Sequence, residues 1–389
     1  MSGTAGGLRI VRLANFVTAR SGGLRTALRH LGEGYRAAGH HPVLVIPGRR
    51  TADEWHPWGR VVTLVGPELP GSGGYRLLAG RRRLARVLAE LAPDRLEVSD
   101  RSSLRWTGRW ARANGVPSVM VSHESLTGLL GQWGVPDALR RPTADRLNRA
   151  TSRAYDRIVC TTRWAAEEFH RIGADNVHLV PLGVDLDTFH PGRADPRLRE
   201  RYADPTELLL VHCARLSPEK RPELAVQALA ELRRAGVPAV LVMAGDGPLR
   251  TALARRAAGL PVTFTGFLPD RAAVAALLAS ADVVLAPGPV ETFGLAGLEA
   301  LACGTPVVVN AASALPEVVG GAGLAAYGSA ASMAAAVTAL AARPEAERRR
   351  AARARAEEFG WPAAVAGFLR VHGAETGRGT PGRGDHGTA

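Results

Sequence analysis

Two series of short apolar segments alternate with segments of helical spacing, and they constrain the fold of this chain more than any other feature. In the first series, residues 8–16 (LRIVRLANF) and 42–48 (PVLVIPG) are typical of buried strands, and residues 24–39 between them have helical spacing. The expected strands of the second series are 208–216, 239–245, 262–267, 282–288 and 305–310. Short apolar strands that alternate with helices indicate parallel sheets covered on both faces. We therefore expect an α/β protein.

A segment rich in Pro, Gly and Asp separates the two series near residues 181–206 and is typical of a linker. A length of 389 residues also favours two or three domains. We predict two doubly wound, Rossmann-like domains that face each other across a cleft, with ligands at the carboxyl ends of the strands. The tail at 373–389 is Gly-rich and polar, and we expect it to be disordered.

The charge of the chain is strongly basic and unevenly distributed. The formal net charge is +13, and residues 1–187 contribute +10 of it, against +3 from residues 188–389. A GC-rich genome alone would explain many arginines, but the asymmetry predicts that an anionic membrane or a polyanion meets the N-terminal half. Nucleic acid is a poor candidate for this polyanion, because aromatic residues make up only 5% of the chain and no nucleic-acid-binding module is recognisable.

The cysteines and the apolar runs indicate a cytosolic protein. The three cysteines are far apart and form no CxxC pair, which argues for reduced thiols and against a disulfide framework or a zinc site. The first residues lack the features of a signal peptide, and no apolar run reaches the ~18 residues of a spanning helix.

Three loops that follow expected strands carry residues suited to anion binding. Gly22 and Gly23 precede a helix, where glycines let backbone N–H groups approach an anion, although such pairs are also common in plain tight turns. Arg215 and Lys220 follow the first strand of the second series, and Lys220 is the only lysine in the chain. An Arg and a Lys on one loop are more usually a pair of solvated surface charges. A compact ammonium nevertheless fits between phosphate oxygens where a planar guanidinium is too wide, so the lone lysine favours a diphosphate site.

The third loop, APGPVETFGLAGLEALACGTP, contains two carboxylates eight residues apart. Glu291 ends a loop, and Glu299 lies one or two turns into the following helix among apolar residues. A carboxylate in such surroundings needs a partner, and the vicinal diol of a sugar or ribose would satisfy it. Capping by Glu291 and a solvent-facing Glu299 is the alternative. The backbone at Phe293, Gly294 and Leu295 opens this helix and offers free N–H groups.

Four features together resemble those of retaining glycosyltransferases of the GT-B fold, family 4. They are the E-x7-E pair Glu291/Glu299, the Arg215/Lys220 pair, the Gly22–Gly23 loop and the sequence PLGVD. The resemblance covers roughly residues 8–372. Further short sequences resemble those of GDP-mannose-dependent mannosyltransferases that act on phosphatidylinositol mannosides: ANF, RSGGLRTA, LEVSDRSSL, VSHE, VCTT, PLGVDLDTFHP and LACGTP.

The resemblance implies a domain plan. It consists of an acceptor-binding domain at 1–187, a nucleotide-sugar-binding domain at 188–358 and a C-terminal helix at 359–372 that returns to the N-terminal domain.

The resemblance also implies roles for individual residues. Glu291 would hold hydroxyls of the transferred sugar, Glu299 the nucleotide ribose, and Arg215 and Lys220 the diphosphate. His123, after the apolar strand 116–121, would position the sugar; without the family, a structural histidine is the better interpretation. The remaining donor-binding positions complete the phosphate cradle or meet the base: Gly22, Gly23, Phe293, Gly294, Leu295, Phe267 and Leu268.

No metal or other cofactor is expected. The DLD sequence at 185–187 mimics a metal motif of another glycosyltransferase fold, but it lies beside Pro and Gly, where a turn is favoured. The charge of the leaving group would instead be offset by Arg215 and Lys220.

Residues 75–91 combine arginines with a leucine-rich face and are typical either of a helix packed in the core or of one that lies on an anionic membrane. A lipid acceptor favours the membrane, at the inner face of the cell membrane. The arginines concerned are Arg76, Arg81, Arg82, Arg83 and Arg86. A second set, Arg101, Arg105, Arg109 and Arg112, has helical spacing and is a candidate for the acceptor phosphate.

The expected function is retaining transfer of mannose from GDP-mannose to a lipid-linked acceptor, a phosphatidylinositol mannoside. Two alternatives share the donor-site residues. One is a glycosyltransferase that uses another nucleotide sugar and a soluble or natural-product acceptor, and the other is a nucleotide-sugar epimerase that transfers nothing.

Overall fold

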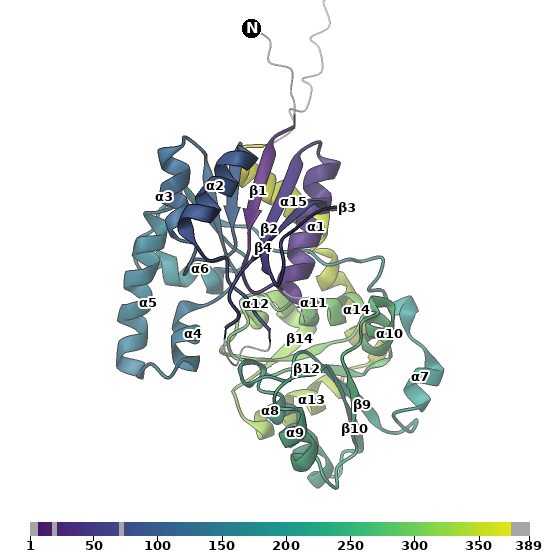
Figure 1. Cartoon of the computed structure of the whole chain (residues 1–389). Coiled ribbons are helices and arrows are strands. Elements are labelled where there is room, and N and C mark those ends of the chain that lie inside the picture. Colours follow the sequence, from purple (N-terminus) through teal and green to yellow (C-terminus); the bar gives the residue numbers. More distant parts are fainter. Residues whose placement is uncertain (1–6, 18–21, 70–73, 375–389) are drawn as a thin grey trace, which may run out of the picture.

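The computed structural model describes residues 7–17, 22–69 and 74–374, and in them two α/β domains lie one above the other (Figure 1). The expected disordered tail falls, from residue 375 on, outside the described residues. The N-terminal sheet has the strand order β3-β4-β2-β1-β5-β6-β7-β8. Its strands are β1 Arg9–Leu13, β2 His41–Gly48, β3 Ala52–His56, β4 Gly59–Val65, β5 Arg95–Val98, β6 Ser118–Ser122, β7 Arg157–Cys160 and β8 Val177–Leu179.

Helices connect these strands and cover the N-terminal sheet: α1 Gly23–Ala37, α2 Arg81–Leu91, α3 Trp106–Ala113, α4 Leu126–Gln132, α5 Asp137–Ser152 and α6 Arg163–His170. Every pairing in this sheet is parallel except that of β3 with β4, which is antiparallel. β3 lies at the sheet edge with mostly exposed side chains, so its sequence, ADEWH, lacks the apolar pattern of a buried strand.

The second sheet has the order β11-β10-β9-β12-β13-β14, with all pairs parallel. Its strands are β9 Leu208–Cys213, β10 Ala239–Ala244, β11 Val262–Gly266, β12 Val283–Ala286, β13 Val307–Asn310 and β14 Gly323–Ala326. Its helices are α7 Pro196–Glu200, α8 Pro222–Arg234, α9 Arg250–Arg256, α10 Arg271–Ser280, α11 Leu295–Ala302, α12 Leu315–Val319, α13 Ala330–Ala341 and α14 Glu345–Glu357, with 3-10 turns η1 Pro191–Arg193, η2 Pro218–Lys220 and η3 Gly320–Ala322. Two doubly wound, parallel α/β domains confirm the predicted fold class.

The strand order places the second-domain loops where a ligand would bind. β9 lies between β10 and β12, so the connections that leave β9 and β12 diverge to opposite sides of the sheet. Such a topological switch point leaves a crevice at the carboxyl ends of the two strands. The loop with Arg215 and Lys220 follows β9, and the loop with Glu291 follows β12. These residues therefore meet at one edge although they are far apart in the sequence.

The last helix, α15 Trp361–His372, packs on the N-terminal domain (Figure 1). Its imidazole His372 Nε2 contacts Glu97 Oε2 at 3.0 Å, and Tyr35 of α1 donates to the same oxygen at 2.7 Å. Arg12 Nε donates to the other oxygen, Oε1, at 2.7 Å. Burial would raise the pKa of Glu97, but Arg12 and His372 outweigh it and hold the pKa well below its usual range. This buried cluster fastens α15 to strands β1 and β5.

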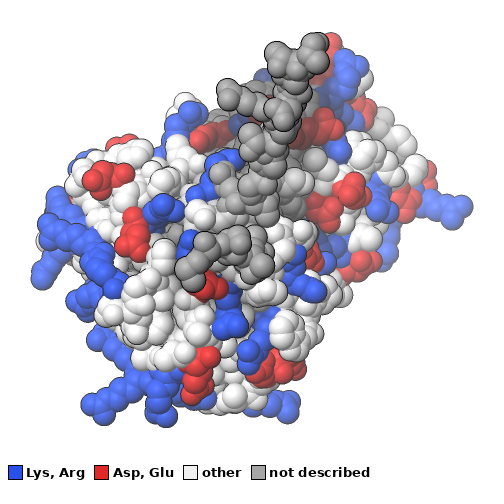
Figure 2. All heavy atoms as spheres, turned by 90° about the horizontal axis from the view of Figure 1, so that it is seen from above, with Lys and Arg blue, Asp and Glu red and all other residues white. Residues whose placement is uncertain are grey.

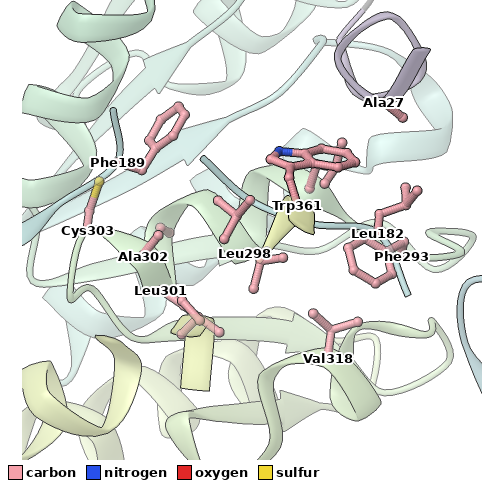
Figure 3. Close-up of a cluster of buried hydrophobic side chains, with 14 of the residues drawn as sticks. Ala27, Leu182, Phe189, Phe293, Leu298, Leu301, Ala302, Cys303, Val318 and Trp361 are labelled. Carbon is pink, nitrogen blue, oxygen red and sulfur yellow. The ribbon is translucent and has the colours of Figure 1, made fainter. Parts of the chain in front are cut away.

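A shared apolar core joins the two domains where the chain crosses between them. Figure 3 shows Trp361 of α15 between Ala27 of α1 on one side and Phe293 and Leu298 of the second domain on the other. The chain crosses at two adjacent points, because the backbone N–H of Val184 donates to Phe359 O at 2.8 Å. In the described residues, no helix is long and apolar enough to cross a bilayer.

Candidate active site

Lys220 and Glu291 meet at the carboxyl edge of the second sheet. Lys220 Nζ donates a hydrogen bond to Glu291 Oε1, and both side chains are about three-quarters buried. The close approach of their loops favours glycine at position 288, because a Cβ there would lie 3.0 Å from Glu219 O and 3.3 Å from Lys220 Cα. Burial alone would lower the pKa of Lys220, but the Glu291 carboxylate offsets it and the pKa is raised. The ammonium therefore stays charged at neutral pH.

Arg215 faces an aromatic pair from the N-terminal domain. Its guanidinium carbon lies 5.3 Å from the centre of the Tyr75 ring, a cation–π distance. Tyr75 in turn meets Phe16 edge-to-face, with ring centres 5.9 Å apart. Phe16 has a φ of 60°, which is uncommon for a residue other than glycine and is a form of strain found at functional sites. The sequence reasoning missed both aromatic residues.

Glu299 has a protein partner that its local sequence did not reveal. Arg271, at the start of α10, places Nη2 2.9 Å from Glu299 Oε1 and stacks over the Phe189 ring at 4.7 Å. Burial raises the pKa of Glu299, and nearby Asp185 acts in the same direction while Arg271 opposes both. The prediction that Glu299 needs a partner is thus met by Arg271 in this structure, and the ribose role stays a prediction.

The N-termini of α1 and α11 meet across the domain interface. A Cβ added at Gly23 would lie 3.5 Å from Leu295 Cδ1, whereas Gly22 is exposed with open space around it. Gly294 has a φ of 79° and would place a Cβ 2.4 Å from Leu315, so the start of α11 requires glycine. Phe293 is buried edge-to-face against Phe359 and supplies backbone, not a side chain, to this region. The N-termini of two helices thus lie close together, and helix N-termini are favourable places for a phosphate.

His123 follows β6 and lies beside the Glu291 loop. Its Nε2 is 3.2 Å from Ser99 Oγ, and its carbonyl accepts a hydrogen bond from Thr292 Oγ1 at 2.7 Å. Burial lowers the pKa of His123 to about 4, and Arg12 and Arg101 act in the same direction. The imidazole is therefore neutral at physiological pH, which suits hydrogen bonding to a sugar.

Phe267 and Leu268 follow β11 at the same edge of the sheet. Phe267 is exposed, and Leu268 is half-buried against the shared core. A role in stacking on a base stays a prediction.

Two expectations about charged residues change. Arg101 does not lie on a helical face, because α3 begins at Trp106; it is buried and donates to Asn148 and to the carbonyl of Glu124. Arg76 is not free for a membrane, since it pairs with Glu68 at 2.7 Å. The turn expected at residues 185–187 is confirmed, because Asp185 accepts backbone hydrogen bonds from Asp187 and Thr188.

Helix α2 also differs from the expected membrane-lying helix. It begins at Arg81, and its apolar residues Leu84, Leu88 and Leu91 are buried in the core of the N-terminal domain. Arg81, Arg82, Arg83 and Arg86 are exposed. The sequence pattern was compatible with both arrangements, and the structure places the leucines in the core.

Comparisons with known proteins show the family of the chain. The model of the family described as "Glycosyl transferase 4-like domain" matches residues 22–183, and that of "Glycosyl transferases group 1" matches residues 196–358. The chain is 53% identical, over 94% of its length and 96% of the relative, to the GDP-mannose-dependent alpha-(1-6)-phosphatidylinositol dimannoside mannosyltransferase of Mycobacterium tuberculosis (strain H37Ra). It belongs to the GT-B glycosyltransferases of family 4. A GDP-mannose-dependent alpha-mannosyltransferase of Mycolicibacterium smegmatis is 31% identical over 77% of this chain and 79% of the relative.

Solved structures support the fold of this glycosyltransferase. Sucrose-phosphate synthase from Thermosynechococcus elongatus superposes with a TM-score of 0.77 at 20% identity, covering 94% of this chain and 98% of the other. WaaG, a glycosyltransferase involved in lipopolysaccharide biosynthesis, has a TM-score of 0.68 at 18% identity, covering 95% and 100%. At these identities the likeness concerns the two-domain GT-B architecture alone.

Proposed function

We propose that this glycosyltransferase transfers mannose from GDP-mannose to a phosphatidylinositol mannoside with retention of the α configuration. The observation that carries the proposal is the 53% identity, over nearly the whole of both chains, to an enzyme named for that donor and for phosphatidylinositol dimannoside. The paired loops at the domain interface provide the chemistry that such a transfer needs.

The donor would lie along the carboxyl edge of the second sheet. Lys220 and Arg215 bind the diphosphate, and the backbone N–H groups at Gly22, Gly23 and residues 293–295 add dipoles of the same sign. Glu291 holds hydroxyls of the mannose from its position beside Lys220. Glu299 binds the ribose diol with the oxygen that Arg271 leaves free, and the guanine lies near Phe267 and Leu268.

Catalysis depends on stabilising the departing diphosphate. As the glycosidic bond breaks, negative charge develops on the phosphate oxygen, and two fixed cations at that position lower the barrier. Arg215 and Lys220 supply this charge, so the proposed reaction uses no metal ion. The acceptor hydroxyl attacks from the face that the diphosphate leaves, which retains the configuration, and its proton passes to the departing phosphate oxygen. Neutral His123 hydrogen-bonds the sugar near the reacting carbon.

The N-terminal domain would present the enzyme to the lipid. Figure 2 shows basic side chains gathered along the left and lower-left edge, the side on which Figure 1 places α2, α3 and α5. Because the leucines of α2 are buried, attachment rests on the exposed arginines Arg81, Arg82, Arg83 and Arg86 and is electrostatic. The proposed location is the cytoplasmic face of the cell membrane, as a peripheral protein.

The test is a transfer assay with purified protein, a panel of radiolabelled nucleotide sugars and defined phosphatidylinositol mannosides. We expect label from GDP-mannose to appear in a lipid with one further hexose. A labelled water-soluble product, or an altered donor sugar without transfer, would instead support a soluble acceptor or an epimerase.

A further inference from the structure

Thr292 lies between Glu291 and Phe293 and joins the two domains through both its side chain and its backbone. Its Oγ1 donates to the carbonyl of His123 at 2.7 Å, and its own carbonyl accepts from Thr162 Oγ1 at 2.9 Å. The side chain is 8% exposed. The loop that carries the candidate sugar carboxylate is therefore held on both sides by the other domain.

Glu317 of α12 makes a second contact across the same interface. Its two carboxylate oxygens accept from the backbone N–H groups of Arg163 and Trp164, at 3.0 and 3.1 Å. These are the first residues of α6, whose N-cap is Thr162. A carboxylate from one domain thus satisfies free N–H groups of a helix in the other, where the helix dipole also favours negative charge.

The two contacts belong to one unit of the second domain. The backbone N–H of Ala314, which leads into α12, donates to the carbonyl of Glu291 at 2.9 Å. Residues 291–317 consequently dock on α6 and on the loop after β6 as a single surface. That loop carries His123, the one proposed sugar-contacting residue supplied by the N-terminal domain.

We propose that Thr292 and Glu317 are positioning residues, and that their docking on the N-terminal domain fixes Glu291 relative to His123. Neither side chain needs to touch the substrate. The sugar subsite is complete only when these hydrogen bonds form, so domain closure and assembly of the subsite are the same event. This inference rests on the proposed function, because it assigns Glu291 and His123 to the same transferred sugar.

The structure offers variants that separate positioning from folding. Thr292→Val keeps the shape but leaves the His123 carbonyl without its donor, and Thr292→Ser restores the hydroxyl. Glu317→Ala removes the second contact at a distance from the substrate, and Glu317→Gln keeps an acceptor oxygen. Thr305→Val is the matched control, since Thr305 Oγ1 donates to Leu278 O at 2.7 Å within one domain.

The experiment measures kcat and donor KM in mannosyl transfer, and the radius of gyration by X-ray scattering with and without GDP. For Thr292→Val and Glu317→Ala we expect kcat to fall about tenfold to a hundredfold, the loss expected when a buried hydrogen bond is removed. Donor KM should change less than kcat, because both cations proposed for the diphosphate lie in the second domain. With GDP bound, both variants should have a larger radius of gyration than the wild type. The serine variant should recover most of the kcat, and the glutamine variant, which keeps one of the two acceptor oxygens, should recover part of it.

The inference is overturned if Thr292→Val has the same kcat and the same radius of gyration as the wild type. A loss of kcat that Thr305→Val reproduces equally, or that Thr292→Ser does not restore, also overturns it. If Thr292→Val does not fold, Glu317→Ala decides by the same criteria. Failure of the proposed function is distinguishable from failure of this inference, because the wild type would then not transfer mannose. Scattering with GDP would still report whether the variants change domain closure.

Discussion

Lys220 Nζ donates a hydrogen bond to Glu291 Oε1 and joins two loops whose residues are 71 positions apart. The only lysine of the chain, which we propose to bind the diphosphate, therefore also contacts the proposed sugar carboxylate. Gly288 packs directly against the turn that carries it, so little room is left for a wider cation.

We expect Lys220→Arg to lower kcat about 100-fold, because a planar guanidinium would displace Glu291 and a misplacement of about 1 Å can have such an effect. The measurement is steady-state mannosyl transfer. Arg234→Lys, on the exposed face of α8, is the control and should leave the rate unchanged. Full activity of Lys220→Arg would mean that charge alone matters at this position.

Arg271→Ala should make donor binding more sensitive to acid. The Arg271 guanidinium favours the charged form of Glu299, so its removal raises the already raised pKa of that carboxyl further. Protonated Glu299 accepts fewer hydrogen bonds from a ribose diol. We expect the acid limb of log(kcat/KM) for GDP-mannose to move to higher pH by about one unit. Arg271→Lys keeps the charge and should leave the limb in place; an unmoved limb in Arg271→Ala would contradict the coupling.

Replacement of Arg81, Arg82 and Arg83 by glutamine should weaken binding to anionic vesicles by about 1 kcal/mol for each arginine, and the loss should shrink as salt rises. Co-sedimentation with vesicles that contain phosphatidylinositol measures it. Glutamine at Arg234, Arg255 and Arg256, which are exposed on the second domain, gives a variant of equal charge. Equal loss in both variants would show that net charge, and not the α2 surface, governs binding.

Glu97→Gln should destabilise the protein by about 3–5 kcal/mol, because it leaves Arg12 buried without its counter-ion. The folded pKa of Glu97 is depressed, so its contribution to stability is fully present above the unfolded value. The contribution is lost as pH falls toward the folded value. The difference in urea midpoint between wild type and variant should thus be constant above about pH 5 and shrink below about pH 4. A difference that grows on acidification would contradict this assignment.

The apolar runs were sufficient to predict the two sheets, because short continuous apolar segments such as β9 and β10 fit few structures other than a buried parallel strand. The edge strand β3 was not predictable, since its side chains face water. For α2, the sequence could not distinguish a leucine face in the core from one on a membrane, because both present the same periodicity. Arg101 shows the same limit, as its burial depends on Asn148 and Glu168, which lie in distant parts of the chain.

For the candidate site, the sequence predicts residues but not their contacts. Lys220, Glu291 and Glu299 are identifiable from residue type, spacing and family resemblance. The partners Arg271 for Glu299 and Tyr75 for Arg215 come from other loops, and nothing in their local sequence marks them. Thr292 is similar: a threonine beside a motif glutamate is unremarkable until the other domain is in place.

The two adjacent crossings of the chain, at Val184 and Phe359, restrict how the domains can move. A single linker would allow the second domain to swing and to twist. Two linkers that a backbone hydrogen bond holds side by side restrict the domains more strongly, and rotation about a single axis is then the easiest motion. Rotation about that axis would separate Glu291 from His123, and the reverse rotation would bring the same two residues back together.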